Sequence, residues 1–99
     1  DHADCDDSVI SYIRRGHNLD DYLIVVCNFT PVVRHNYRVG VNEACRYQEI
    51  FNSDDKNYWG SGVRNEGLIE VQGQGWNMKP YSIEIVLPPL STIVIKPIR

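Results

Sequence analysis

The sequence of 99 residues has few strong helix formers and no segment typical of a membrane or nucleic-acid-binding protein. Alanine occurs twice, methionine once and lysine three times, which disfavours a helical fold. No apolar run approaches the ~18 residues of a membrane span, and no basic segment precedes an apolar one as in a signal peptide. The formal net charge is −3, and the largest basic cluster is the pair Arg14-Arg15. We therefore expect neither a membrane nor a nucleic-acid partner.

Cysteine is also scarce, with three residues at positions 5, 27 and 45. No two have CxxC spacing, so neither a zinc site nor a thioredoxin-type motif is predicted. Three well-separated thiols indicate a reducing compartment, and we expect a cytoplasmic protein. Cys27 lies in an apolar run and is expected to be a small buried hydrophobic residue. The chain begins without methionine, and we expect it to be part of a longer protein.

Residues suited to catalysis or metal binding lack the required spacing. The three histidines are far apart in predicted loops, and no serine lies in a GxSxG motif. The acidic start, Asp4 to Asp7, lacks the glycine and glutamate of a calcium loop and is expected to be a solvated chain start. No carboxylate pair is placed to flank a cleft, as glycoside hydrolysis requires. We predict no catalytic residue, no metal site and no cofactor in this chain.

Two glycine-rich segments and one sequon have simple structural explanations. Gly60-Ser61-Gly62 and Gly73-Gln74-Gly75 do not lie between a strand and a helix, as phosphate-binding loops do. They are expected to form turns with positive φ. Asn28-Phe29-Thr30 matches the glycosylation sequon. Because Asn28 ends an apolar run, we interpret this match as accidental.

The abundant residues are those that fit a pleated sheet. Eleven valines, ten isoleucines and two threonines make 23 of the 99 residues β-branched, and ten more are aromatic. Alternating or continuous apolar segments, separated by turn residues, predict strands at 8–15, 22–29, 37–41, 47–51, 68–72, 81–87 and 91–96. About seven strands at such spacing predict an all-β fold, an antiparallel β-sandwich. We expect residues 1–99 to form one domain.

Two segments allow more specific predictions. Residues 22–29 are almost continuously apolar, as in a strand that is buried on both faces. Residues 81–87 and 91–96 each carry isoleucines on one face and flank Pro88-Pro89-Leu90. We expect these two strands to form an antiparallel hairpin, and Pro97 to end the second strand.

Aromatic residues stand beside polar ones in two predicted loops. Tyr58 and Trp59 lie in the loop 52–66, and Trp76 lies in the loop 73–80. Rings that cover the apolar faces of sugars, next to polar groups that reach hydroxyls, are typical of sugar-binding surfaces. The alternative is that Tyr58 and Trp76 cap the ends of the sandwich core.

Several segments together resemble the C-terminal β-domain of bacterial glycogen branching enzymes, in the α-amylase superfamily. They are Val25-Val26-Cys27-Asn28-Phe29-Thr30-Pro31-Val32-Val33-Arg34, Tyr37-Arg38-Val39-Gly40-Val41, residues 8–15, residues 49–54 with 58–61, and residues 81–90. The resemblance covers essentially the whole chain in the right order. It implies a parent enzyme that cuts an α-1,4-glucan and transfers the piece to a 6-hydroxyl group. It also implies that the catalytic Asp, Glu and second Asp belong to a barrel domain outside this chain.

The resemblance leaves two roles open for the chain itself. In the first, it is a non-catalytic domain that packs against the catalytic barrel of the parent, and Tyr37, Val39 and Val41, or Ile69 and Val71, form the docking face. This role predicts an exposed apolar patch. In the second, it is a carbohydrate-binding module that contacts α-glucan through Tyr58, Trp59 or Trp76.

Overall fold

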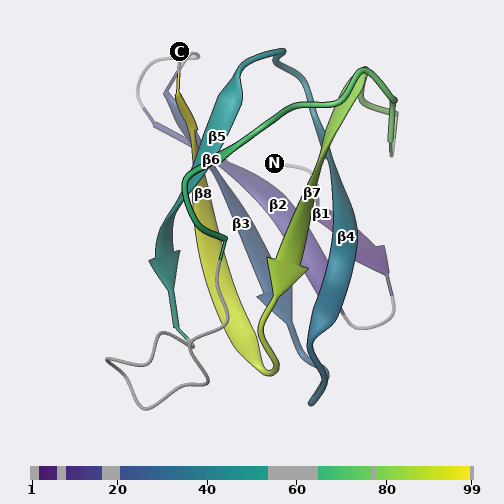
Figure 1. Cartoon of the computed structure of the whole chain (residues 1–99), viewed down its shortest axis with the longest axis vertical. Helices are drawn as coiled ribbons and strands as arrows, with labels where there is room; N and C mark the ends of the chain where they lie inside the picture. Colours follow the sequence, from purple (N-terminus) through teal and green to yellow (C-terminus); the bar gives the residue numbers. More distant parts are fainter. Residues whose placement is uncertain (1–2, 7–8, 17–20, 54–64, 77, 99) are drawn as a thin grey trace.

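A computed structural model of the chain describes residues 3–6, 9–16, 21–53, 65–76 and 78–98. The described residues form only strands and connections, so the predicted all-β fold is confirmed (Figure 1). The strands are β1 (Ala3–Asp6), β2 (Val9–Arg15), β3 (Tyr22–Asn28), β4 (Arg34–Val41), β5 (Arg46–Asn52), β6 (Leu68–Ile69), β7 (Tyr81–Leu87) and β8 (Ser91–Ile98).

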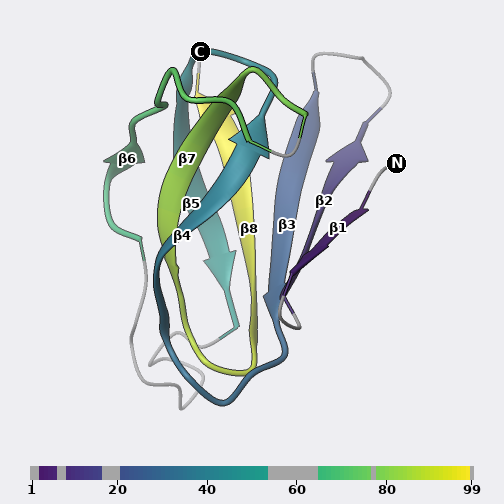
Figure 2. The same ribbon diagram turned by 90° about the vertical axis from the view of Figure 1, so that its right-hand side faces the viewer.

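The strands form two antiparallel sheets that pack face to face as a β-sandwich. The larger sheet has the order β1-β2-β3-β8-β5-β6, and the smaller sheet pairs β4 with β7. Figure 2 shows β4 and β7 crossing one face of the larger sheet. The other face of the larger sheet, called the outer face below, is turned away from β4 and β7.

The core lies between the two sheets, and the strands with several core residues, β3, β4, β7 and β8, contribute every second residue. Because side chains alternate along a strand, one face of each sheet is apolar and faces the other sheet. The smaller sheet contributes Val39, Val41, Ile83, Ile85 and Leu87, and the larger sheet contributes Val9, Tyr22, Ile24, Val26, Tyr47, Ile69, Ile93 and Ile95.

The predicted hairpin of residues 81–87 and 91–96 is wrong. β7 pairs with β4, whereas β8 pairs with β3 and β5, so the chain changes sheets at Pro88-Pro89-Leu90. The apolar faces of β7 and β8 meet across the core instead of lying side by side. A backbone hydrogen bond joins this crossing to the β3–β4 connection: the Leu90 N–H group donates to the Thr30 carbonyl oxygen at 2.9 Å.

Asn28 fastens the same crossing from inside the sandwich. Its Nδ2 group donates to the carbonyl oxygens of Pro88 at 2.9 Å and Val32 at 3.1 Å. Its Oδ1 atom accepts hydrogen bonds from the backbone N–H and the hydroxyl of Thr30. With Asn28 almost fully buried, the amide is committed to the fold, which supports the interpretation of the sequon as accidental.

Four smaller expectations are also corrected. The acidic start is not only a solvated tail, since β1 pairs with β2 at the sheet edge. β6 has two residues instead of the predicted 68–72. β8 continues through Pro97, which pairs with β5 where the register with β3 has already ended, so its missing N–H removes no bond to β3. Among the described glycines only Gly67 has positive φ, so the expectation for Gly73 and Gly75 is wrong.

Candidate functional site

Trp76 lies on a tight turn that packs against β4. Its N–H donates to the Lys79 carbonyl oxygen and the Lys79 N–H donates to the Trp76 carbonyl oxygen, both at 3.0 Å. Gly40 permits this approach, because a Cβ atom there would collide with the Trp76 carbonyl oxygen. Trp76 is 40% exposed and is not part of the core cluster. The alternative in which Trp76 caps the core is therefore wrong.

Arg38 connects Trp76 to the smaller sheet. Its guanidinium group lies over the indole, 5.9 Å from the ring centroid. Its Nη2 group donates to Glu84 Oε1 at 3.0 Å, and its Nη1 group donates to Ser82 Oγ at 2.7 Å and Gln72 Oε1 at 3.0 Å. Gln72 Nε2 donates to the same Glu84 oxygen at 2.9 Å. We call Arg38, Gln72, Glu84 and Trp76 the Arg38–Trp76 surface.

The strand pairing fixes the Arg38–Trp76 surface. Arg38 lies opposite Glu84 in the β4–β7 register. An isolated β-bridge between Gln72 and Ser82 places the segment around Gln72 beside β7 as well. Charge-assisted bonds among partly buried groups hold the side chains in place. The result is a fixed surface with an indole, an amide and a carboxylate, which are the groups that contact sugar rings and hydroxyls.

Sequence reasoning missed Arg38, Gln72 and Glu84 as neighbours of Trp76. The alternation within 37–41 places Arg38 on the face opposite Val39, and the alternation within 81–87 does the same for Glu84. The alternation therefore could have predicted that Arg38 and Glu84 point away from the core. It could not have predicted that β4 pairs with β7, because the sequence favoured a hairpin of β7 and β8. The other predicted ring residues, Tyr58 and Trp59, lie outside the described residues.

The predicted docking face is wrong. Val39, Val41 and Ile69 are buried members of the core, and Tyr37 and Val71 are partly buried against it. These residues therefore face the inside of the sandwich.

Cys27 is less buried than the sequence predicted. It is only partly buried, and its Sγ atom accepts a hydrogen bond from Thr92 Oγ1 at 3.5 Å.

Two buried tyrosines form a hydrogen-bonded group at one end of the core. Tyr47 donates its hydroxyl to the Glu43 carbonyl oxygen at 2.7 Å, and Tyr22 donates to the Glu43 carboxylate at 2.8 Å. Desolvation by burial raises the pKa of Tyr22 to about 12 and also raises the pKa of Tyr47. Both phenols therefore stay protonated near neutral pH and serve as hydrogen-bond donors.

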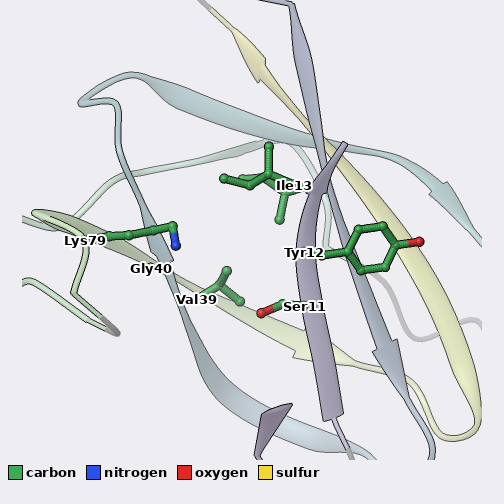
Figure 3. Close-up of a pocket in the computed structure, with 7 residues that line it drawn as sticks. Ser11, Tyr12, Ile13, Val39, Gly40 and Lys79 are labelled. Carbon is green, nitrogen blue, oxygen red and sulfur yellow. The ribbon is translucent and has the colours of Figure 1, made fainter. Parts of the chain in front are cut away.

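The hollow between β2 and β4 is too small for a substrate. It has a volume of about 10 Å³, about the space of one water molecule. Figure 3 shows Ile13, Ser11 and Val39 on one side of β2, with the ring of Tyr12 pointing away from them.

Within the described residues no group of three or more His, Cys, Asp or Glu side chains could hold a metal ion. That part of the chain also contains no helix suited to crossing a membrane.

These features define the class of the protein as a two-sheet antiparallel β-sandwich with a fixed aromatic and polar surface. A family model described as "Alpha amylase, C-terminal all-beta domain" matches residues 1–98. The chain belongs to this family of all-β domains, as the resemblance in the sequence indicated.

Curated relatives with closely similar sequences are named "1,4-alpha-glucan branching enzyme GlgB". The chain is 50% identical over 99 residues to the protein of Halothermothrix orenii, covering 100% of this chain and 16% of that protein. It is 48% identical over 95 residues to that of Rubrobacter xylanophilus, covering 96% and 13%. It is 45% identical over 96 residues to that of Aquifex aeolicus, covering 97% and 15%. The chain thus spans 13–16% of the length of these relatives.

Proposed function

We propose that this chain is a non-catalytic domain of a 1,4-α-glucan branching enzyme. The observation that carries the proposal is identity of up to 50% across the whole chain to proteins named as branching enzymes, of which it spans 16% or less. The parent enzyme would cut an α-1,4-glucan and transfer the piece to form an α-1,6 branch in the cytoplasm. This domain would support the catalytic domain of the same chain and influence which glucan is used.

A comparison of the full-length parent with the 99-residue chain tests this proposal. Each protein is incubated with linear amylose, and the α-1,6 linkages are counted by proton NMR or after enzymatic debranching. We expect branches with the parent and none with the chain alone. Failure of the full-length parent to form branches would contradict the assignment to a branching enzyme. Branch formation by the chain alone would contradict its non-catalytic role.

The Arg38–Trp76 surface favours a second candidate function, contact with α-glucan. Trp76 is 40% exposed, and its orientation is fixed by Arg38 and by the turn with Lys79. A ring that is already held in place loses little conformational entropy when a sugar stacks on it. In this function Trp76 would cover the apolar face of a glucose unit, and Tyr58 and Trp59 could extend the contact.

An NMR titration with a linear malto-oligosaccharide tests the second function. The indole N–H signals of Trp59 and Trp76 are followed in the 99-residue chain and in the variant Trp76→Ala. We expect a saturable shift of the Trp76 signal, and weaker binding in the variant without loss of the folded spectrum. The matched control is Met78→Ala, because Met78 is fully exposed on the same turn. Unchanged signals at millimolar sugar would refute glucan contact here.

A further inference from the structure

A second polar site lies beside β5, where its pairing with β6 ends. The register of the two strands extends only as far as Gln48 and Leu68, so Glu49 has no partner on β6. Before Leu68 the chain turns away from β5 at Gly67, which has a φ of 66°. Glycine permits this turn, because a Cβ atom makes positive φ strained. Figure 2 shows β6 and the residues before it at one side of the sandwich.

Asn65 brings this segment back to the two sheets. Its Nδ2 group donates to the Val86 carbonyl oxygen at 2.9 Å, and its Oδ1 atom accepts from the Val86 N–H at 2.8 Å. Its backbone N–H and its Nδ2 group also donate to Glu49 Oε1, at 3.2 and 2.9 Å. The segment 65–67 is therefore held to β5 at both ends, by Asn65 and by Leu68, and bows outward between them.

A pocket of about 330 Å³ lies between β5 and this bow. It is lined by Gln48, Glu49, Asn65, Glu66 and Gly67. The volume is at the lower end of the range for ligand pockets. It equals the space of about eleven water molecules in the liquid, and a glucose unit has about as many non-hydrogen atoms. The pocket, called the Glu49–Asn65 pocket below, therefore holds one sugar unit.

The carboxylate of Glu49 is fixed in the wall of the pocket. Its Oε1 atom accepts both hydrogen bonds from Asn65, and its Oε2 atom accepts one from Asn52 Nδ2 at 3.2 Å. A carboxylate has about four acceptor positions, so Oε2 has room for one further donor. Because the side chain is already held, it loses little conformational entropy when a ligand binds.

The groups around Glu49 suit a neutral ligand that is rich in hydroxyl groups. Glu66 adds a second carboxylate and Gln48 an amide, and both residues are exposed. Carboxylates accept strong hydrogen bonds from hydroxyl groups, and an amide can donate to one hydroxyl and accept from the next. Among the described residues that line the pocket there is no lysine or arginine, so a phosphorylated sugar would be repelled.

The surroundings of the pocket favour the end of a sugar chain over its middle. The bow closes against β5 at Asn65 and at the Gln48–Leu68 pair. On the inner side, the adjoining residues Tyr47 and Ile69 belong to the core, so a chain cannot continue through the sandwich. An internal sugar unit needs an exit for the chain on two sides, whereas a terminal unit needs only one.

We propose that the Glu49–Asn65 pocket binds the terminal glucose unit of an α-glucan chain. This inference rests on the second candidate function, because it takes α-glucan as the ligand. It adds a separate site that does not include Trp76. The Arg38–Trp76 surface has no preference for a chain end, since a ring can stack on an internal unit as well as on a terminal one.

Hydrogen–deuterium exchange of the full-length parent, measured on its peptides by mass spectrometry, tests the pocket. Maltose, glucose and β-cyclodextrin are titrated separately, and β-cyclodextrin is a closed ring of α-1,4-linked glucose units without a chain end. We expect maltose to slow exchange in the peptides that contain Gln48 and residues 65–67, and β-cyclodextrin to leave them unchanged. Equal protection by these two sugars would overturn the assignment to a chain end. Protection by glucose at a much lower concentration than by maltose would also overturn it, since the site would then serve the free sugar.

A matched pair of variants tests the residues of the pocket. Glu66→Ala removes a carboxylate from the pocket, whereas Glu70→Ala removes one from the same segment outside it. Glu70 forms an exposed ion pair with Arg46, whose loss costs little. Glu66→Ala in the parent should raise the maltose concentration for half-maximal protection about tenfold, as expected for one lost charge-assisted hydrogen bond. Gln48→Ala should raise it several-fold, and Glu70→Ala should leave it unchanged. Equal effects of Glu66→Ala and Glu70→Ala would contradict the proposal.

The peptide that contains Trp76 separates this inference from the function on which it rests. Protection of that peptide without protection at the pocket would refute the inference and leave glucan contact at Trp76 in place. Protection at the pocket alone would support the inference and refute contact at Trp76. No protection of either segment at millimolar sugar would refute both. None of these measurements depends on branching activity, so the assignment of the parent is tested separately.

Discussion

Replacement of Asn28 by alanine should destabilise the domain at the point where the chain crosses from one sheet to the other. The Asn28 amide joins three segments, namely the end of β3, the β3–β4 connection and the β7–β8 crossing. It donates to the carbonyl oxygens of Pro88 and Val32 and accepts from the Thr30 N–H. Alanine removes these bonds together in a site that is only 1% exposed.

The size of the loss follows from the partners that remain. The Pro88 carbonyl oxygen keeps a hydrogen bond from Ser91 Oγ at 2.7 Å, so it is not left without a donor. The Val32 oxygen and the Thr30 N–H are partly buried and regain water in part. With about 1 kcal/mol for each lost bond, and more where a group stays buried, we expect a loss of about 2–4 kcal/mol.

Urea unfolding of the 99-residue chain, followed by circular dichroism, measures this loss as a lower midpoint at an unchanged slope. Thr30→Val is the matched control, because it removes the hydroxyl bond to Asn28 Oδ1 at 2.6 Å and a long contact to the Val32 carbonyl oxygen at 3.5 Å but keeps both Asn28 donor bonds, and it should cost less than about 1 kcal/mol. Asn28→Asp keeps the acceptor for Thr30 and loses both donors, so its carboxylate faces two carbonyl oxygens and should destabilise strongly near neutral pH. A loss below about 1 kcal/mol for Asn28→Ala would refute the assignment of Asn28 as the connection between these segments.

Three further predictions concern the core, the turn and the tyrosine pair. Ile93→Ala should lower the free energy of unfolding by about 2–5 kcal/mol, since Ile93 is fully buried; a loss near that of a surface substitution would contradict its place in the core. Gly40→Ala should cost about 1–3 kcal/mol and change Trp76 fluorescence, because the added Cβ atom meets the Trp76 carbonyl oxygen; an unchanged spectrum would show that the turn does not pack there. The pKa of Tyr22 is raised from 10.0 to about 12, so the folded state holds this proton while the unfolded chain loses it. The contribution of Tyr22 to stability should therefore be constant up to about pH 10 and then fall by about 1.4 kcal/mol per pH unit until about pH 12, with Tyr47 adding to the decline, and Tyr22→Phe should remove the Tyr22 part in a pH series of urea unfolding.

The sequence alone determined the fold class and the position of most strands. An excess of β-branched residues and the spacing of turn residues predicted an antiparallel sandwich. The run 81–87 coincides with β7, and 22–29 differs from β3 by one residue. These features are local, because alternation and turn chemistry depend on neighbouring residues only. The segments that carry the family resemblance were equally accessible from sequence.

The tertiary structure alone decided which strands pair and which faces meet. β7 and β8 each present isoleucines on one face, and such a pattern fits both a hairpin and a crossing between two sheets. Hydrogen bonds from Asn28 and Leu90 to distant segments select the crossing. That choice buries Val39 and Val41 in the core, joins Arg38 to Glu84 beside Trp76, and leaves the apolar row from Tyr12 through Val25 and Val94 to Phe51 on the outer face. Alternation specifies that a strand has two faces, but only long-range pairing determines what each face contacts.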